Sequence, residues 1–136
     1  MYLLDTNVVS ELRRTRPHGA VLAWLETVAA VELHLSAVTI GEIQSGIEAA
    51  RENDASKARQ IEIWLEQVVA AYSILPMDAR TFRIWARLMH RQPSQLAQDA
   101  MIAATAIASN LTVATRNTRD FQRFDIPVLN PFAVPP

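Results

Sequence analysis

The chain alternates very short apolar runs with longer segments in which apolar residues recur at helical spacing. Short apolar runs of this kind are typical of strands buried in a parallel sheet. The predicted strands cover residues 2–4, 33–38, 73–75, 111–115 and 126–129. Because helices are predicted between them, the sheet should be mostly parallel and covered on both faces. The pattern predicts the α/β class, as a three-layer α/β/α sandwich with a mostly parallel central sheet.

Local signals predict where several elements begin and end. The apolar pattern that starts at Val21 continues to about Glu32, and Thr39 begins the next helix. Asp78 is predicted to cap a helix whose buried face includes Phe82. The proline-rich tail, residues 131–136, is predicted to be extended.

Size and composition restrict the classes of protein that the chain can represent. Its 136 residues suit one domain, residues 1–136, and the absence of cysteine excludes disulfides and zinc–thiolate sites. The net charge of -1 gives no overall basic field. No apolar run approaches the ~20 residues of a membrane span, and the acid at position 5 interrupts any secretory leader. We expect a cytoplasmic protein without a membrane partner.

Four acids follow predicted strands at the places where an open sheet binds ligands. Asp5 ends the first strand, and Glu42 lies one turn into the helix after the second. Asp99 lies near the start of a helix that is apolar nearly all round, and Asp120 follows the fourth strand. If the connections fold as predicted, these carboxylates converge on one edge of the sheet. Crowded carboxylates repel unless a cation lies among them, and hard oxygen ligands without a His or Cys cluster favour Mg²⁺ or Mn²⁺.

The first two acids also have purely structural interpretations. Asp5 or Thr6 could cap the first helix. Thr39-x-x-Glu42 matches a capping box, in which Glu42 would bind the Thr39 amide. Gly46, one turn beyond Glu42, would leave room beside the carboxylate, although a glycine used for packing would look the same.

A purely structural role explains Asp120 more easily than Asp99. Asp99 shares its helix face with apolar residues, where an unpaired acid costs several kcal/mol if buried. Asp120 could be a turn acid paired with Arg116 or Arg123. Asp99 is therefore the strongest single candidate for function.

Arginine dominates the basic residues, with twelve arginines against the single Lys57. Arginine is the better bidentate binder of phosphate. Four arginines form one stripe on a predicted helix, at positions Arg80, Arg83, Arg87 and Arg91. Such a stripe is usually a solvated face, and it could also follow a phosphate backbone.

Four motifs in a fixed order resemble the PIN-domain family, and within it the VapC and FitB toxins of bacterial toxin–antitoxin pairs. The resemblance spans the whole chain. Its motifs are Asp5-Thr6-Asn7-Val8-Val9-Ser10-Glu11, Ser36-x-x-Thr39-x-x-Glu42, Asp99-Ala100-Met101-Ile102-Ala103-Ala104-Thr105-Ala106 and Thr115-Arg116-Asn117-x-x-Asp120-Phe121.

The resemblance implies a role for each matching residue. Asp5, Glu42 and Asp99 match the family's metal-binding acids, with Asp5 and Asp99 expected as direct ligands, and Asp120 completes the catalytic set. Asn117 stands where other members have a further aspartate. The residues expected to line or support the pocket are Thr6, Asn7, Glu11, Thr115 and Asn117. Arg13, Arg14 and Arg116 are expected to contact RNA.

The activity implied by the resemblance is that of a Mg²⁺- or Mn²⁺-dependent endoribonuclease toxin. Metal-activated water would cleave an RNA phosphodiester bond. The resemblance further implies a homodimer and a cognate antitoxin, VapB- or FitA-like, that silences the toxin and alone contacts operator DNA.

Three other functional classes share features with this chain. A catalytically weak or inactive PIN-like binding module could act in a toxin–antitoxin or DNA-binding complex, and Asn117 favours that alternative. Haloacid-dehalogenase phosphatases and response-regulator receivers also place an acid after the first strand. Both need a lysine at a later strand end, whereas Lys57 lies in a predicted polar turn.

Overall fold

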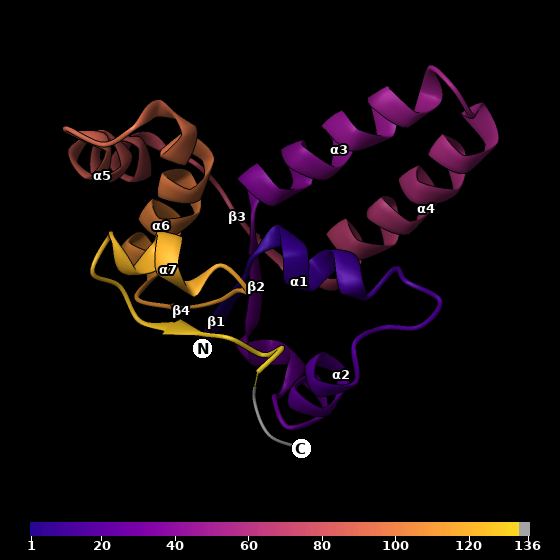
Figure 1. The fold of residues 1–136 in the computed structure, drawn as a ribbon, viewed down its shortest axis with the longest axis horizontal. Helices are drawn as coiled ribbons and strands as arrows, with labels where there is room; N and C mark the ends of the chain where they lie inside the picture. Colours follow the sequence, from indigo (N-terminus) through magenta and orange to yellow (C-terminus); the bar gives the residue numbers. More distant parts are fainter. Residues whose placement is uncertain (134–136) are drawn as a thin grey trace.

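Five parallel strands form one sheet in a computed structural model that describes residues 1–133 (Figure 1). The order across the sheet is β3-β2-β1-β4-β5. The strands are β1 (Tyr2–Leu4), β2 (Leu33–Ser36), β3 (Ser73–Leu75), β4 (Thr112–Ala114) and β5 (Val128–Leu129). The parallel sheet predicted from the alternating pattern is therefore confirmed.

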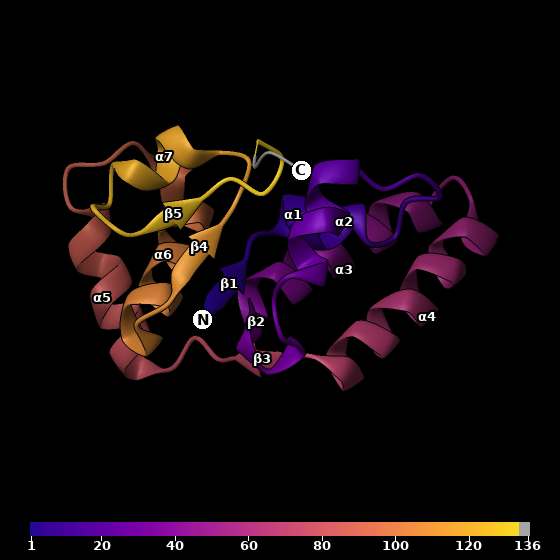
Figure 2. The same ribbon diagram turned by 90° about the horizontal axis from the view of Figure 1, so that it is seen from below.

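Helices cover both faces of this sheet, which confirms the three-layer α/β/α arrangement. The α5, α6 and α7 helices lie on one side, whereas α1 and α2 lie on the other, and α3 and α4 form an antiparallel pair that extends beyond the sheet (Figures 1 and 2). The helices are α1 (Thr6–Glu11), α2 (Gly19–Glu26), α3 (Ala37–Arg51), α4 (Ala55–Ala71), α5 (Ala79–Met89), α6 (Ala97–Ser109) and α7 (Thr118–Gln122). Within residues 1–133, none of them is long and apolar enough to cross a membrane.

Consecutive strand residues enter opposite cores, because side chains alternate along a strand. Leu3 packs in the cluster beneath α6 that contains Phe121, while Leu4 packs in the cluster with Val9 and Leu35. All five side chains are fully buried. A strand buried on both faces reads as an unbroken apolar run, which explains the pattern Tyr2–Leu4 in the sequence.

The strand order of the sheet has a topological switch point between β1 and β4. After β1, the strands β2 and β3 are added on one side, whereas β4 and β5 are added on the other. Crevices at such switch points are the usual ligand sites of open α/β sheets. Asp5 and Thr115, which directly follow β1 and β4, therefore lie at the place where a site is expected.

Two predicted helix boundaries are wrong, and side-chain caps explain both. The helix predicted to reach Glu32 ends at Glu26, where the Thr27 hydroxyl donates to the Trp24 carbonyl at 2.6 Å. The next α-helix begins at Ala37 rather than Thr39, because Ser36 accepts a hydrogen bond from the Val38 amide. The capping box of Thr39 and Glu42 does not form.

The predicted buried face of α5 is wrong at Phe82, although Trp85 and Met89 do pack against the core. Asp78 caps this helix as predicted, but Phe82 is 44% exposed. Thr81 is buried instead, since its hydroxyl donates to Asp78 at 2.7 Å and its polar atom is satisfied.

The tail begins with a turn rather than an extended segment. Asn130 accepts hydrogen bonds from the amides of Phe132 and Ala133. The remaining predicted tail, residues 134–136, lies outside the described part of the chain.

Candidate functional site

Acids from three separate elements meet at one cavity of about 300 Å³, which we call the acidic cavity. Asp5 follows β1, Glu42 lies in the second turn of α3, and Asp99 lies in the first turn of α6. The complete lining is Asp5, Thr6, Asn7, Ser10, Glu42, Asp99 and Asn117. The strand ends thus gather carboxylates that are far apart in the sequence, as the alternating pattern predicts.

Asp5 is the most buried of these acids, with 4% of its surface exposed, and it is held by three hydrogen bonds. One carboxylate oxygen accepts from the Thr6 amide at 2.8 Å, so Asp5 does cap α1. The other oxygen accepts from the Thr115 hydroxyl at 2.8 Å and from the Asn7 side-chain amide at 3.2 Å. Burial raises the pKa of Asp5, although these hydrogen bonds act in the opposite direction. Capping α1 does not prevent the Asp5 carboxylate from also binding a cation.

Thr115 and Asn7 connect the ends of β1 and β4. The fully buried Thr115 hydroxyl, besides donating to Asp5, accepts from the backbone amide of Asn117 at 2.9 Å. The side-chain oxygen of Asn7 accepts from the backbone amide of Arg116 at 3.3 Å. This network fixes the orientation of the Asp5 carboxylate.

Glu42 is half-buried and points into the acidic cavity. Burial raises its pKa, the Thr6 hydroxyl lowers it, and the charges of Asp5 and Asp99 raise it further. The Thr6 hydroxyl also lies 3.1 Å from the hydroxyl of Thr39, so its single proton can be directed to either partner.

The pKa of Asp99 is strongly raised, which favours the neutral form of its carboxyl group. Burial and the charges of Asp5 and Asp120 raise the pKa of Asp99 to about 6. Asp120, in the first turn of α7, therefore lies near enough to act on Asp99, but it does not line the acidic cavity. It has no ion pair with Arg116 or Arg123 in the described residues.

The residues present suit a hard divalent cation. Carboxylates that raise one another's pKa are stabilised by a positive charge between them, and oxygen is the ligand that Mg²⁺ and Mn²⁺ prefer. Within residues 1–133, no group of three acidic or imidazole side chains already stands in ligand geometry. Mg²⁺ commonly binds through only one or two carboxylates and several waters, so a cation site does not require three protein ligands.

Other predicted site residues lie outside the acidic cavity. The buried Glu11 carboxylate accepts from the His18 amide at 2.9 Å and pairs with Arg14 at 3.0 Å, and the His18 hydrogen bond is the main reason that the pKa of Glu11 is lowered. Arg116 stacks its guanidinium on the ring of Phe132 at 3.8 Å. Glu11 therefore holds the loop after α1, and Arg116 is an exposed cation next in sequence to Asn117, which lines the acidic cavity.

Two residues that contribute to the site were not predicted as site residues from the sequence. Ser10 lines the acidic cavity, and Thr39 supports Thr6 from α3. Ser10 lies four residues after Thr6, so both side chains lie on the same face of α1, and this spacing is the signal that could have identified Ser10. The arginine stripe is exposed and away from the cavity, and Arg80 donates to the Ala108 carbonyl at the end of α6.

Residues 2–127 match the family described as PIN domain. The chain belongs to the PIN-domain family. Among relatives of this PIN-domain chain, toxin FitB of Neisseria gonorrhoeae is 37% identical over 97% of the chain and 99% of the toxin. The VapC ribonuclease Y4jK of Sinorhizobium fredii is 38% identical over 97% of the chain and 98% of its own length.

Solved structures of PIN-domain toxins superpose closely on the present fold. A crystal structure of FitAcB from Neisseria gonorrhoeae has a TM-score of 0.86 at 36% identity, covering 98% of this chain and 100% of the matched chain. A structure of FitAB bound to an IR36 DNA fragment has a TM-score of 0.85 at 35% identity, covering 100% and 99% of the two chains. The fold predicted from the sequence therefore agrees with the family.

Proposed function

We propose that this PIN-domain chain, as one domain over residues 1–136, is a Mg²⁺- or Mn²⁺-dependent endoribonuclease that acts as the toxin of a toxin–antitoxin pair. The observation that carries the proposal is the meeting of Asp5, Glu42 and Asp99 at one cavity with pKa values raised by burial. Support also comes from relatives named VapC ribonuclease and toxin FitB.

Each residue of the site receives a specific task under this proposal. Asp5 and Asp99 would hold the cation, and Thr115 and Asn7 keep the Asp5 carboxylate in place. A bound divalent cation would supply activated water and neutralise charge on the phosphodiester. Glu42, with its raised pKa, is suited to accept a proton from the attacking water. Asp120 would act through its charge on Asp99.

Exposed arginines near the acidic cavity would hold the RNA backbone. Arg116 is held by its contact with Phe132, and Arg13 lines an adjoining pocket. Arg14, which pairs with Glu11, would contribute to binding mainly by ordering the loop.

We further propose that the chain forms a homodimer and is silenced by a VapB- or FitA-like antitoxin. Related structures are described as FitAB, bound to DNA, and as VapBC of Rickettsia felis, bound to a promoter fragment. By analogy, operator DNA would contact the antitoxin rather than this chain.

Cleavage of a mixed-sequence RNA in Mn²⁺ tests the catalytic part of the proposal. Asp5→Asn and Asp99→Asn should each lose at least about 100-fold in rate, because each substitution removes a carboxylate from the cation site. Chelation with EDTA should abolish cleavage by the parent.

Asp125→Asn is the matched control for charge removal. Asp125 is exposed, and its φ of 53° lies in the left-handed region that asparagine adopts readily. This variant should cleave at the parent's rate. Full activity in Asp5→Asn or Asp99→Asn contradicts the proposal.

The alternative function, a weak or inactive PIN-like binding module, rests on one residue. Asn117 lines the acidic cavity at the place where a further carboxylate would add a ligand. If the parent leaves RNA intact in Mn²⁺ and still binds an antitoxin, this alternative replaces the nuclease.

A further inference from the structure

A second cavity of about 290 Å³ adjoins the acidic cavity, and we call it the side pocket. The two cavities share the lining residues Thr6, Ser10 and Glu42. Whatever fills the side pocket therefore lies next to the molecule bound among the acids. Its volume is at the lower end of the range for small-ligand pockets, roughly 300 Å³.

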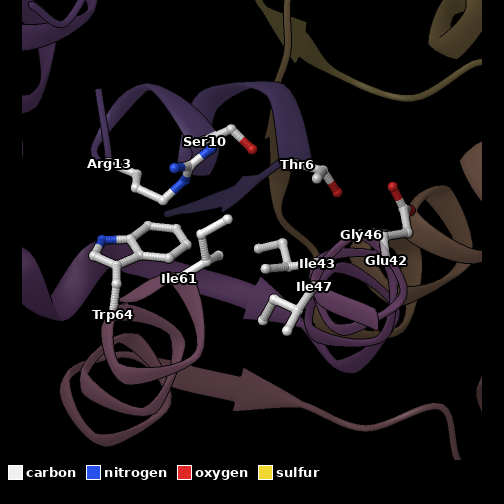
Figure 3. Close-up of a pocket in the computed structure, with 9 residues that line it drawn as sticks. All are labelled: Thr6, Ser10, Arg13, Glu42, Ile43, Gly46, Ile47, Ile61 and Trp64. Atoms are coloured by element: carbon white, nitrogen blue, oxygen red, sulfur yellow. The ribbon is translucent and has the colours of Figure 1, made fainter. Parts of the chain in front are cut away.

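The side pocket has one apolar wall and one polar wall. Figure 3 shows Ile43 and Ile47 of α3 and Ile61 and Trp64 of α4 along one side, with Ser10 and Thr6 on the opposite side. Flat apolar surfaces with an aromatic ring bind nucleobases by stacking, and hydroxyl groups can meet the polar edges of a base.

The two ends of the side pocket carry opposite charge. Glu42 lies at the end shared with the acidic cavity, whereas Arg13 lies at the end near Trp64 (Figure 3). Arg13 has no carboxylate partner in the part of the chain that the structure describes, and it shares a neighbouring cavity with Lys57. The acidic cavity, the apolar wall and Arg13 therefore follow one another along the protein surface. A strand of RNA fits this order, because each nucleoside has a phosphate on either side.

We propose that the side pocket binds the nucleobase next to the scissile phosphate of RNA. Trp64 is the stacking surface, and Arg13 binds the phosphate on the far side of that base. This inference rests on the proposed function of the acidic cavity. The free cationic end favours RNA over a segment of a partner protein.

Gly46 allows the pocket to be closed without removing any contact. It lines the side pocket, and a Cβ atom at this position would meet nothing within 4 Å. Gly46→Leu should therefore fill the pocket while improving helix propensity. Gly41, on the same helix, also has no atom within 4 Å of a built Cβ and does not line the pocket, so Gly41→Leu is the matched control.

The test is the affinity of a fluorescein-labelled, mixed-sequence RNA of about 12 nucleotides, measured by anisotropy in an Asp5→Asn background that leaves the RNA intact. Gly46→Leu and Trp64→Leu should weaken binding about 5- to 100-fold, and Trp64→Phe and Gly41→Leu should stay within about threefold. An abasic RNA of the same length should bind the Gly46→Leu and Gly41→Leu proteins equally. Arg13→Ala should reduce the salt slope by about one.

The failure of this inference can be distinguished from the failure of the proposed function. Cleavage by the parent, together with unchanged RNA affinity in Gly46→Leu and Trp64→Leu, overturns the side-pocket assignment alone. A pocket that serves a protein segment gives the same result for RNA and also overturns it. Absence of cleavage by the parent counts against the nuclease, while the binding measurements still report on the pocket.

Discussion

At the scale of single residues, the site depends on how Asp5 is held. Its carboxylate is buried, so its charged form is costly, and three hydrogen bonds offset part of that cost. The Thr115 hydroxyl is the only one of these donors that follows β4, because Thr6 and Asn7 lie in the first turn of α1, after β1. Thr115 therefore joins the two strands at the switch point through the acid itself.

Thr115→Val tests this support without changing side-chain shape. Loss of the hydroxyl should raise the pKa of Asp5 further and weaken Mn²⁺ binding and RNA cleavage by about 10- to 100-fold, the usual effect of removing a group that orients a metal ligand. Thr115→Ser, which keeps the hydroxyl, should stay near the parent. Equal cleavage by the valine variant and the parent would show that Thr115 is dispensable.

At the scale of secondary-structure elements, the caps decide where each acid points. Ser36 ends β2 and begins α3, and its buried hydroxyl also lies 3.3 Å from that of Thr105 in α6. The start of α3 sets the rotation of the helix and therefore the direction of Glu42. Ser36 thus connects strand, helix and site.

Ser36→Ala should lower the free energy of unfolding by about 1–2 kcal/mol, because the Val38 amide loses its cap and Thr105 loses a partner. Urea denaturation measures this change. Ser45→Ala, at an exposed position of the same helix, should stay within about 0.5 kcal/mol of the parent. A loss as large in Ser45→Ala as in Ser36→Ala would contradict the role of the cap.

The elements also show how far the sequence alone could lead. The order of strands and helices and the gathering of Asp5, Glu42 and Asp99 follow from short apolar runs and strand-end acids, which are local patterns. The start of α3 was missed because both Ser36 and Thr39 can cap, and the choice depends on where β2 ends. The burial of Thr81 in α5 was missed because it depends on a hydrogen bond to Asp78, which apolar periodicity does not register.

The site chemistry was predictable only in part for a similar reason. Carboxylates at strand ends are visible in the sequence, so the acidic cavity could be predicted. Glu11 could not be placed, because the partners of its carboxylate, His18 and Arg14, belong to a loop with no periodic pattern. The side pocket depends on the packing of α1 against the α3–α4 pair, which no local pattern specifies.

At the scale of the whole molecule, the acidic cavity opposes folding when no cation is bound. The pKa of Asp99 is raised to about 6 in the folded chain from an ordinary value of 3.8. Between these values the folded state binds more protons than the unfolded state, so the contribution of Asp99 to stability falls as pH rises through this window. Above about pH 6 the destabilising effect is fully present.

Asp99→Asn should therefore stabilise the metal-free protein at pH 8 by on the order of 1 kcal/mol, after allowance for solvent screening. This corresponds to a rise in melting temperature of roughly 2–5 °C, and the difference from the parent should shrink toward pH 4. Thermal melts in EDTA across this range measure the effect. A difference that grows toward low pH would contradict the sign of the shift.

The central claim is that acids from separate elements form one divalent-cation site, and calorimetric titration with Mn²⁺ at pH 7.5 tests it most directly. The parent and Asp125→Asn should bind Mn²⁺ with equal affinity, whereas Asp5→Asn and Asp99→Asn should each bind at least about tenfold more weakly. Equal Mn²⁺ affinity in all four proteins would contradict the claim.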